Sequence, residues 1–295
     1  MKQMELKALA KINLGLDVLG KRENGYHDVR MVMQSIYLYD DVKIEVKETS
    51  GIEVKTNLYF LPVDENNIAY KAAKLLTDEF DIKKGVRITL NKHIPVAAGM
   101  AGGSSNAAVV LFGMNRLFRL GLSDKDLMER GVKLGADVPY CIMRGTVLAE
   151  GIGEELTRLP AMPKCNVVIA KPPISVSTRV VYEALDSLEI VEHPDIDGLI
   201  DGLQKGSLEA IAGSMGNVLE SVTIPMYPVI EKIKDEMKAA GALGAMMSGS
   251  GPTVFGLFQN KPAAKKAQAM IREKALAKQV YVTNIHSVRR NEHGV

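Results

Sequence analysis

Residues 94–110, IPVAAGMAGGSSNAAVV, constrain this chain more than any other stretch. Three glycines permit left-handed backbone angles and let the chain approach a ligand closely. Ser104, Ser105 and Asn106 are residue types that cap helix N-termini, and the apolar residues after them recur at helical spacing. A glycine loop that leads into a helix start offers free N–H groups and the positive end of the helix dipole, so we predict a phosphate-binding site here.

This segment differs from the common phosphate-binding motifs. No lysine follows the glycines as in GxxxxGK[ST], and no GxGxxG follows a predicted strand. The protein-kinase motifs HRD and DFG are absent. A tight turn that serves only packing is the better interpretation of a single glycine, but several glycines beside two serines favour anion binding.

Composition excludes several classes of protein. The chain has 295 residues, 46% of them apolar and 24% charged, with a net charge of +2 and the two signs interspersed. We therefore expect a globular protein of two domains, or one large one, with no nucleic-acid partner and no membrane span. The N-terminus is expected to form the first strand and not a signal peptide. Two widely separated cysteines favour a reduced, cytoplasmic environment, and the spacing of the five histidines does not suggest a zinc site.

The periodicity of apolar residues predicts the elements of the first half. A strand over residues 4–20 ends in a polar turn, and a second strand passes through residues 36–38. Residues 42–47 and 52–56 alternate with period two and are predicted to form an antiparallel pair. A helix over residues 66–80 and a strand over 85–90 precede the glycine loop. Ser123 caps a further helix, and residues 145–149 form a short strand.

A loop-rich stretch at residues 151–164 marks the predicted domain boundary. The second half then predicts a buried strand, a helix, several short helices and a strand–turn–strand–helix–strand run at residues 167–170, 175–185, 195–240 and 243–288. This pattern is typical of a ferredoxin-like α+β sandwich with helices on one face.

Two further positions carry candidate chemistry. Lys11 and Asn13 are two residues apart, so on a strand they share one face while Ile12 and Leu14 enter the core. If Lys11 is considered alone, the simpler interpretation is a charged side chain exposed to solvent at the edge of the sheet. Asp137 follows Gly135 and Ala136, where an aspartate usually caps a local turn. It is ionised at neutral pH, so it could also accept a proton.

Three segments together resemble the GHMP kinase superfamily. Its central motif is matched from Pro95 to Ala108, its early basic residue and asparagine by Lys11 and Asn13, and its late glycine turn by MMSGSGPTVFGLF at 246–258. The resemblance implies a two-domain α+β fold. Residues 1–155 would form a ribosomal-protein-S5-domain-2-like, ATP-binding catalytic domain, and residues 156–295 a ferredoxin-like, substrate-binding sandwich.

Finer motifs resemble a branch of the superfamily that acts in the non-mevalonate isoprenoid pathway. They are AKINLGLDVLGKRENGYHD, GADVPY and KPPISVSTRVVYEAL. The implied reaction is ATP-dependent phosphorylation of the 2-hydroxyl of a small molecule, a cytidine diphosphate-linked methylerythritol. ATP would be the co-substrate and Mg²⁺ the metal. No glutamate matches the separate magnesium ligand of better-known members, so phosphates, water and a serine hydroxyl are the expected ligands.

The resemblance also assigns roles to residues. It implies that Asp137 is the general base and that Lys11 orients it and offsets charge. It places ATP against Pro95, Val96, Ala97, Ala98, Gly99, Met100, Ala101, Gly102, Gly103, Ser104 and Ser105, with Asn67 and Lys92 near the adenine. It places the substrate against Asn13, Tyr26, His27, Thr178, Tyr182, Gly249 and Gly251. Either Ser104 or Ser105 could meet phosphate or metal.

Two alternatives remain. One is another small-molecule GHMP kinase, of the homoserine or phosphomevalonate type. Tyr26, His27 and Tyr182 argue against it, because neither of those substrates has a base to stack on an aromatic ring. The other is a non-catalytic ligand sensor, which the presence of both Lys11 and Asp137 disfavours. Without the resemblance, a core position would be the simpler interpretation of Tyr182.

Overall fold

The computed structural model describes residues 2–188 and 192–288. Contacts divide these residues into two units. Unit 1 comprises residues 2–10, Leu38–Val96 and Ala101–Arg144, and unit 2 comprises Lys11–Tyr37, Ala97–Met100 and the described residues from Gly145 onward. Strands β1 (Gln3–Lys21) and β2 (His27–Lys47) each contribute residues to both units. The predicted boundary between residues 155 and 156 stays a prediction.

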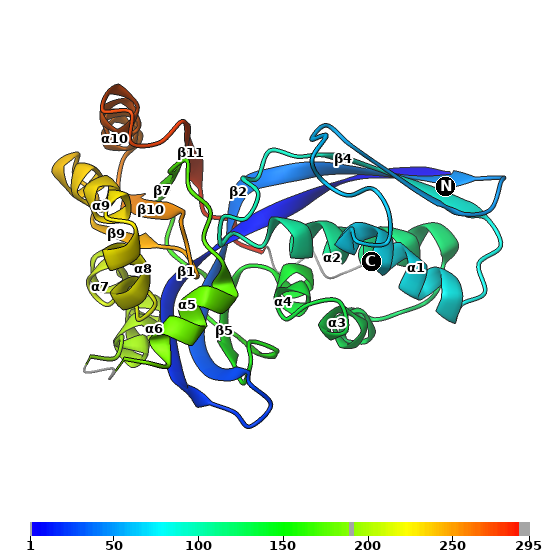
Figure 1. Cartoon of the computed structure of the whole chain (residues 1–295), viewed down its shortest axis with the longest axis horizontal. Helices are drawn as coiled ribbons and strands as arrows, with labels where there is room; N and C mark the ends of the chain where they lie inside the picture. The colour runs from blue at the N-terminus through cyan, green and yellow to red at the C-terminus, as the bar shows by residue number, and fades with distance from the viewer. Residues whose placement is uncertain (1, 189–191, 289–295) are drawn as a thin grey trace. The chain divides into compact units, whose positions relative to one another are not determined.

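Unit 1 is a sheet covered by helices. Its strand order is β3 (Ile52–Thr56), β4 (Gly85–Asn91), β2 and β1. Figure 1 shows the helices α1 (Ile68–Glu79), α2 (Gly102–Phe118), α3 (Asp124–Val132) and α4 (Asp137–Met143) on one side of these strands. Its core includes the fully buried Ile44, Leu76 and Ile88. The predicted helix over residues 66–80 is confirmed as α1, and Ser123 caps α3 in a capping box with Asp126.

The predicted antiparallel pairing of residues 42–47 with 52–56 is wrong. Residues 42–47 of β2 pair antiparallel with β4, and β3 pairs parallel with the other edge of β4, with Val54 opposite Ile88. Parallel neighbours need a crossover connection, and α1 supplies it between β3 and β4. Both strands alternate in either arrangement, so their periodicity could not distinguish the partners.

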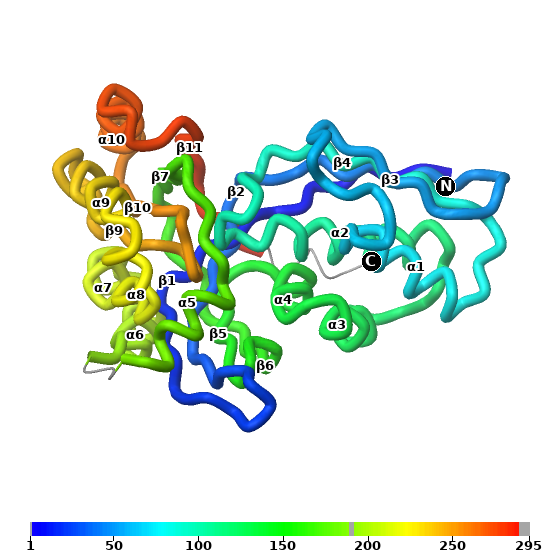
Figure 2. Tube along the Cα trace, viewed as in Figure 1, coloured from blue at the N-terminus to red at the C-terminus, as the bar shows by residue number. Residues whose placement is uncertain are grey.

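Unit 2 contains a four-stranded sheet in the order β11 (Gln279–Asn284), β7 (Asn166–Lys171), β10 (Val254–Phe258) and β9 (Gly244–Met247). All three pairings are antiparallel. In Figure 2 the helices α9 (Val229–Ala239) and α10 (Lys261–Glu273) lie beside this sheet. The predicted ferredoxin-like sandwich is therefore confirmed, with Phe255 and Phe258 buried in its core.

The remaining elements of unit 2 surround the later part of β1 and the earlier part of β2. β5 (Thr146–Glu150) pairs with β2, β6 (Glu155–Arg158) with β5, and β8 (Gly216–Asn217) with β1. β6 lies within the stretch that was predicted to be loop-rich, where four residues that are mostly exposed give no periodic signal. The short helices are α5 (Thr178–Leu185), α6 (Ile196–Lys205), α7 (Leu208–Gly213) and α8 (Glu220–Met226). None of the helices in the described part of the chain is long and apolar enough to cross a membrane.

Candidate active site

The glycine-rich loop has an unusual backbone. Ala97, Gly99 and Ala101 all have left-handed φ angles, at 50°, 68° and 55°. Alternation of left-handed and ordinary residues turns successive N–H groups toward one side, a backbone conformation typical of loops that bind anions. Ala101 is the residue before α2, and no side chain caps that helix. The N–H groups at the helix start therefore have no side-chain cap, and the phosphate-binding role of this loop stays a prediction.

The two serines of the loop lie inside the first turn of α2 and do not cap it. The N–H of Ser105 already donates to the carbonyl of Ala101 at 2.8 Å, so the helix begins before the serines. Ser105 is buried, whereas Ser104 is partly exposed. Of the two hydroxyls, that of Ser104 is the more accessible to a ligand.

A buried ionic network in unit 1 supports the entry to the loop. The carboxylate of Asp40, fully buried on β2, forms an ion pair with the ammonium of Lys92 and accepts hydrogen bonds from the N–H groups of His93 and Ile94 at 2.7 and 2.8 Å. Asn106 joins them: its amide donates to Asp40 at 2.9 Å and accepts from Lys92 at 2.7 Å. Asp40 thus fixes the backbone just before Pro95 and ties it to α2.

Sequence reasoning missed Asp40, although a signal was present. Asp40 falls in phase with the buried Leu38, Val42 and Ile44 on an alternating strand. A carboxylate on the buried face of a strand requires partners, because an unpaired charge there is costly. Lys92, one of the predicted adenine-side residues, is the partner.

Asn67, the other adenine-side residue, is the N-cap of α1. Its side-chain oxygen accepts from the N–H of Ala69 at 2.9 Å, and its amide donates to the carbonyl of Pro62 at 2.7 Å. Asn67 therefore has a structural role whatever else it binds. Asp137 is the first residue of α4, where the helix dipole favours a carboxylate, and it is half-buried.

In unit 2, Lys11 and Asn13 share one face of β1, as predicted. The ammonium of Lys11 donates to the side-chain oxygen of Asn13 at 2.8 Å, and the main-chain N–H of Lys11 donates to the carbonyl of Met100 at 3.2 Å. Lys11 is 5% exposed, and Asn13, Ile12 and Leu14 are fully buried. The interpretation of Lys11 as a solvated edge charge is therefore wrong, since a cation held this deeply must have polar partners.

The glycine turn at residues 248–251 packs directly against Gly99. The hydroxyl of Ser248 donates to the carbonyl of Gly99 at 3.0 Å. A Cβ on Gly99 would lie 2.2 Å from the carbonyl oxygen of Ser248, and a Cβ on Gly249 would lie 3.6 Å from the side-chain oxygen of Asn13. The turn, Gly99 and Asn13 are therefore immediate neighbours within unit 2.

Helix α5 extends this cluster to the predicted cytosine-binding residues. At its start, the hydroxyl of Thr178 lies 2.8 Å from that of Ser250. One turn later the ring of Tyr182 lies 4.9 Å from that of His27, with an interplanar angle of 45°. Tyr182 is half-buried and is not a core residue. Tyr26 is 59% exposed, so its ring is available at the surface next to this pair.

Asp186 orients the His27 ring, and the sequence did not reveal it. One carboxylate oxygen lies 2.6 Å from His27 Nε2, and the other accepts from the ammonium of Lys21 at 2.6 Å. The hydrogen bond to His27, and then that to Lys21, hold the pKa of Asp186 below its ordinary value. An ionised Asp186 favours a proton on Nε2, which leaves Nδ1 as the acceptor in the neutral ring.

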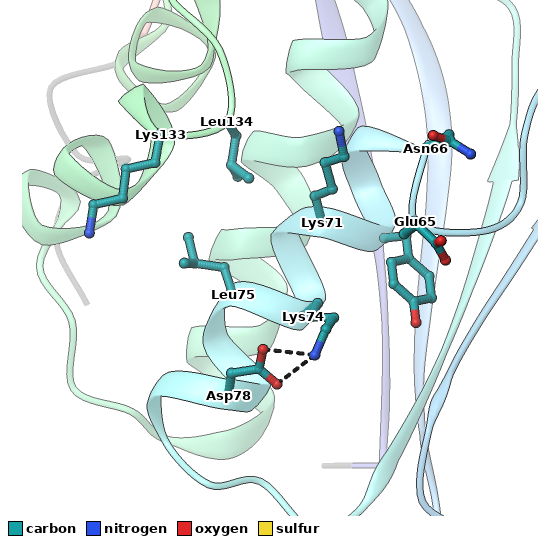
Figure 3. A pocket seen from close by; sticks show the side chains of 9 residues that line it. Glu65, Asn66, Lys71, Lys74, Leu75, Asp78, Lys133 and Leu134 are labelled. Carbon is teal, nitrogen blue, oxygen red and sulfur yellow. Dashed lines mark hydrogen bonds and ion pairs between the residues drawn. The ribbon is translucent and has the colours of Figure 1, made fainter.

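A separate pocket of about 420 Å³ lies along α1 (Figure 3). It is lined by Glu65, Asn66, Tyr70, Lys71, Lys74, Leu75, Asp78, Lys133 and Leu134. Lys74 donates to both carboxylate oxygens of Asp78, at 2.8 and 2.9 Å. None of the predicted site residues lines this pocket.

The cysteines and the acidic residues bear on redox and metal chemistry. Cys141 and Cys165 are both buried and unbonded to each other, and burial raises the pKa of Cys165 to about 12. Such a thiol is unreactive at neutral pH.

No group of three histidine, cysteine, aspartate or glutamate side chains in residues 2–188 and 192–288 is arranged to hold a metal ion.

Comparisons with known proteins agree with this architecture. The models of the GHMP kinase N-terminal domain and of the GHMP kinase C-terminal region match residues 67–145 and 199–277. Homoserine kinase from Cytophaga hutchinsonii has the same fold, with a TM-score of 0.77 at 22% identity over 97% of this chain and 95% of that one. Fold and loops together define an ATP-dependent kinase of the GHMP class.

Closer relatives identify the branch. The chain is 58% identical over 283 residues to 4-diphosphocytidyl-2-C-methyl-D-erythritol kinase of Lachnospira eligens, covering 96% of this chain and 98% of the relative. It is 56% identical to the enzyme of that name from Lachnoclostridium phytofermentans, covering 95% and 96%. A crystal structure of 4-(cytidine 5'-diphospho)-2C-methyl-D-erythritol kinase superposes with a TM-score of 0.82 at 31% identity, covering 97% of this chain and all of that one. The chain belongs to the 4-diphosphocytidyl-2-C-methyl-D-erythritol kinase family.

Proposed function

We propose that this protein transfers the γ-phosphoryl group of ATP to the 2-hydroxyl of 4-diphosphocytidyl-2-C-methyl-D-erythritol, in the isoprenoid pathway that avoids mevalonate. The observation that carries the proposal is the identity of 56–58% to enzymes of that name over at least 95% of the chain. The contiguous cluster of Asn13, the 248–251 turn, Thr178, Tyr182 and His27 supports it.

In the proposed reaction the 2-hydroxyl oxygen forms a bond to the γ-phosphorus. The bond from that phosphorus to the β–γ bridging oxygen breaks, and ADP leaves with the electron pair. The hydroxyl proton passes to the carboxylate of Asp137. Lys11 offsets the negative charge on the reacting groups. Positioning and neutralisation of charge supply most of the catalysis in such transfers, so a weak base suffices.

The ATP phosphates would bind residues 95–105. The left-handed angles of Ala97, Gly99 and Ala101 and the uncapped start of α2 support this proposal, because both leave backbone N–H groups for oxygen ligands. Lys92 and Asn67 would border the adenine. Among the described residues, Lys92 uses two of its three ammonium hydrogens, for Asp40 and Asn106, and Asn67 uses one of its two amide hydrogens, so each keeps one donor for a ligand.

The serine hydroxyl groups near the loop fit a magnesium ion that binds together with the nucleotide. Mg²⁺ prefers oxygen ligands and keeps several waters, so a carboxylate cage is not required. We propose the hydroxyl of Ser104, the more accessible of the two serines, as the protein ligand. When bound, the ion would neutralise charge on the β- and γ-phosphates.

The cytidine would lie at the His27–Tyr182 pair. Asp186 holds the His27 ring in one orientation, which suits it to hydrogen-bond the edge of the base. The exposed ring of Tyr26 offers a second stacking surface, and base stacking on an aromatic ring is worth about 1–3 kcal/mol. The two buried thiols agree with a reducing, cytoplasmic location, which we also propose.

The test is ADP release from the purified protein with ATP and Mg²⁺. The cytidylyl substrate is compared with homoserine and with phosphomevalonate. We expect turnover with the cytidylyl compound alone, and a ³¹P spectrum of the product that shows a new phosphomonoester on the erythritol. Turnover with another alcohol in its place would overturn the substrate assignment. ATP binding without turnover on any of the three would favour a ligand sensor.

A further inference from the structure

The 248–251 turn contains two buried backbone N–H groups that have no hydrogen-bond acceptor among the described residues. Gly249 and Ser250 are both buried, yet their N–H groups form no hydrogen bond with any described residue. The neighbouring N–H groups are satisfied, since Ser248 donates to the carbonyl of Thr253 and Gly251 to that of Ser248. Unpaired buried N–H groups are rare in folded proteins. Two in succession, with φ angles of 59° at Gly249 and 88° at Gly251, indicate an anion-binding turn.

Asn217 fixes this turn from the side. It is 6% exposed and is the last residue of β8. Its amide donates to the carbonyl of Met247 at 2.9 Å and to that of Gly249 at 2.8 Å, while its side-chain oxygen accepts from the N–H of Leu219 at 3.0 Å. Both amide hydrogens are thus used, and the partners define which way the amide points.

Glu220 holds the residue just before the turn. One carboxylate oxygen accepts from the N–H of Met247 at 2.7 Å, and the other accepts from the ammonium of Lys234 at 2.8 Å. Burial lowers the pKa of Lys234, but its hydrogen bonds to Glu220 and Glu231 outweigh that effect and raise the pKa overall. Met247 is therefore fixed at its N–H by Glu220 and at its carbonyl by Asn217.

Asn217 also joins the turn to β1. β8 pairs parallel with β1, with Asn217 opposite Leu16, and the N–H of Val218 donates to the carbonyl of Leu16 at 3.0 Å. Lys11 and Asn13 lie earlier on that strand. A shift of the turn would also disturb Gly99, whose carbonyl accepts from Ser248. Asn217 is thus the link between the strand that carries Asn13 and the turn that packs against it.

We propose that Asn217 is a positioning residue, which holds the N–H groups of Gly249 and Ser250 toward the diphosphate of the substrate, with Glu220 supporting the same turn. This inference rests on the proposed function for the identity of the ligand. Asn217 acts through the backbone of the turn and does not itself touch the ligand.

The test compares Asn217→Asp with a matched control, Asn115→Asp. Asn217→Asp has the same size and can still accept from Leu219, but it loses both donations and sets an oxygen against two carbonyls. Asn115 is also buried, and its amide donates to the carbonyl of Leu122 at 2.8 Å and accepts from the N–H of Leu122 at 3.1 Å, none of which belongs to the predicted site. The control measures the effect of a buried Asn→Asp change alone.

We expect the KM for the cytidylyl substrate to rise by about tenfold to hundredfold in Asn217→Asp, with a smaller rise for ATP, whose loop is reached only through the contact of Ser248 with Gly99. Asn115→Asp should leave both KM values near those of the wild type. A folded Asn217→Asp protein with an unchanged KM for the cytidylyl substrate would overturn the inference. Asn217→Ala, which removes the donors without adding a charge, is judged by the same criterion if Asn217→Asp does not fold.

Binding of cytidine 5'-diphosphate to the wild type separates this inference from the proposed function. In amide hydrogen exchange resolved by residue, saturating cytidine 5'-diphosphate should slow exchange at Gly249 and Ser250. Slowed exchange without turnover on the cytidylyl substrate would refute the proposed reaction but keep the anion-binding turn. Unchanged exchange at both amides, with the compound bound, would overturn the inference even if the enzyme is active.

Discussion

The contact between Gly99 and Ser248 can be tested by adding a single methyl group. In Gly99→Ala, the new Cβ would lie 2.2 Å from the carbonyl oxygen of Ser248 and 3.3 Å from that of Gly251. Both are backbone atoms, so no side chain can rotate away. The turn must move by about 1 Å to reach an ordinary contact distance, and forced repacking of this kind costs about 1–3 kcal/mol.

The backbone of Gly99 adds a second cost. Its φ angle is 68°, and a residue with a Cβ pays about 1–2 kcal/mol in the left-handed region. Together the two effects predict a loss of about 2–5 kcal/mol in the free energy of unfolding. For a chain of this length, that loss lowers Tm by about 2 °C per kcal/mol.

A matched variant separates the two costs. Gly121 has a φ angle of 74°, and a Cβ there would meet no atom within 4 Å. Gly121→Ala therefore pays the backbone cost without the clash, and it gains the same entropy from a stiffer unfolded chain. Calorimetric scans of both variants should show the larger fall in Tm for Gly99→Ala. Equal falls would mean that the turn does not press against Gly99, and the argument for this cluster would be wrong.

Three further predictions concern catalysis, binding and pH. Asp137→Asn should lower kcat by about 10²–10⁴-fold with an unchanged fold by circular dichroism; near-full turnover would disprove the role of base. Asp186→Asn should raise the KM for the cytidylyl substrate and not that for ATP, because the His27 ring loses its ionised partner; a KM for the cytidylyl substrate equal to that of the wild type would contradict this. Lys47 and then Arg87 lower the pKa of Glu53 to about 2. Its contribution to stability is thus complete above its ordinary value near pH 4.5 and is lost as the pH falls toward 2. Urea unfolding of wild type and Glu53→Gln should therefore differ at pH 6 and converge near pH 2.

Sequence alone could predict the parts of this protein that have local signals. The helix over residues 66–80, the Ser123 cap and the ferredoxin-like run at the C-terminal end all follow from periodicity and capping residues, and all are confirmed. The partner of residues 52–56 could not be predicted, because β3 alternates equally well beside β2 or β4. Strand pairing depends on the crossover through α1, which is a property of the chain beyond either strand.

The residues of the candidate site also differ in how well the sequence predicts them. Asn13, Gly249, Thr178, Tyr182 and His27, which the sequence proposes as substrate-binding residues, form one contiguous cluster in unit 2. Their individual roles stay predictions. The beginning of α2 was misjudged, because the left-handed Ala101 is not visible in a sequence where alanine favours helix.

Two of the residues that sequence reasoning missed share one physical property. Asp40 and Asn217 are buried polar side chains whose partners include backbone groups of a loop distant in sequence, residues 93–94 for one and residues 247 and 249 for the other. A loop that must leave its own N–H groups free for a ligand cannot stabilise itself with them. Its conformation must then be held from outside, by side chains that satisfy its remaining groups. A polar residue in phase with a buried face, near no obvious partner, is therefore the signal to look for beside a glycine-rich loop.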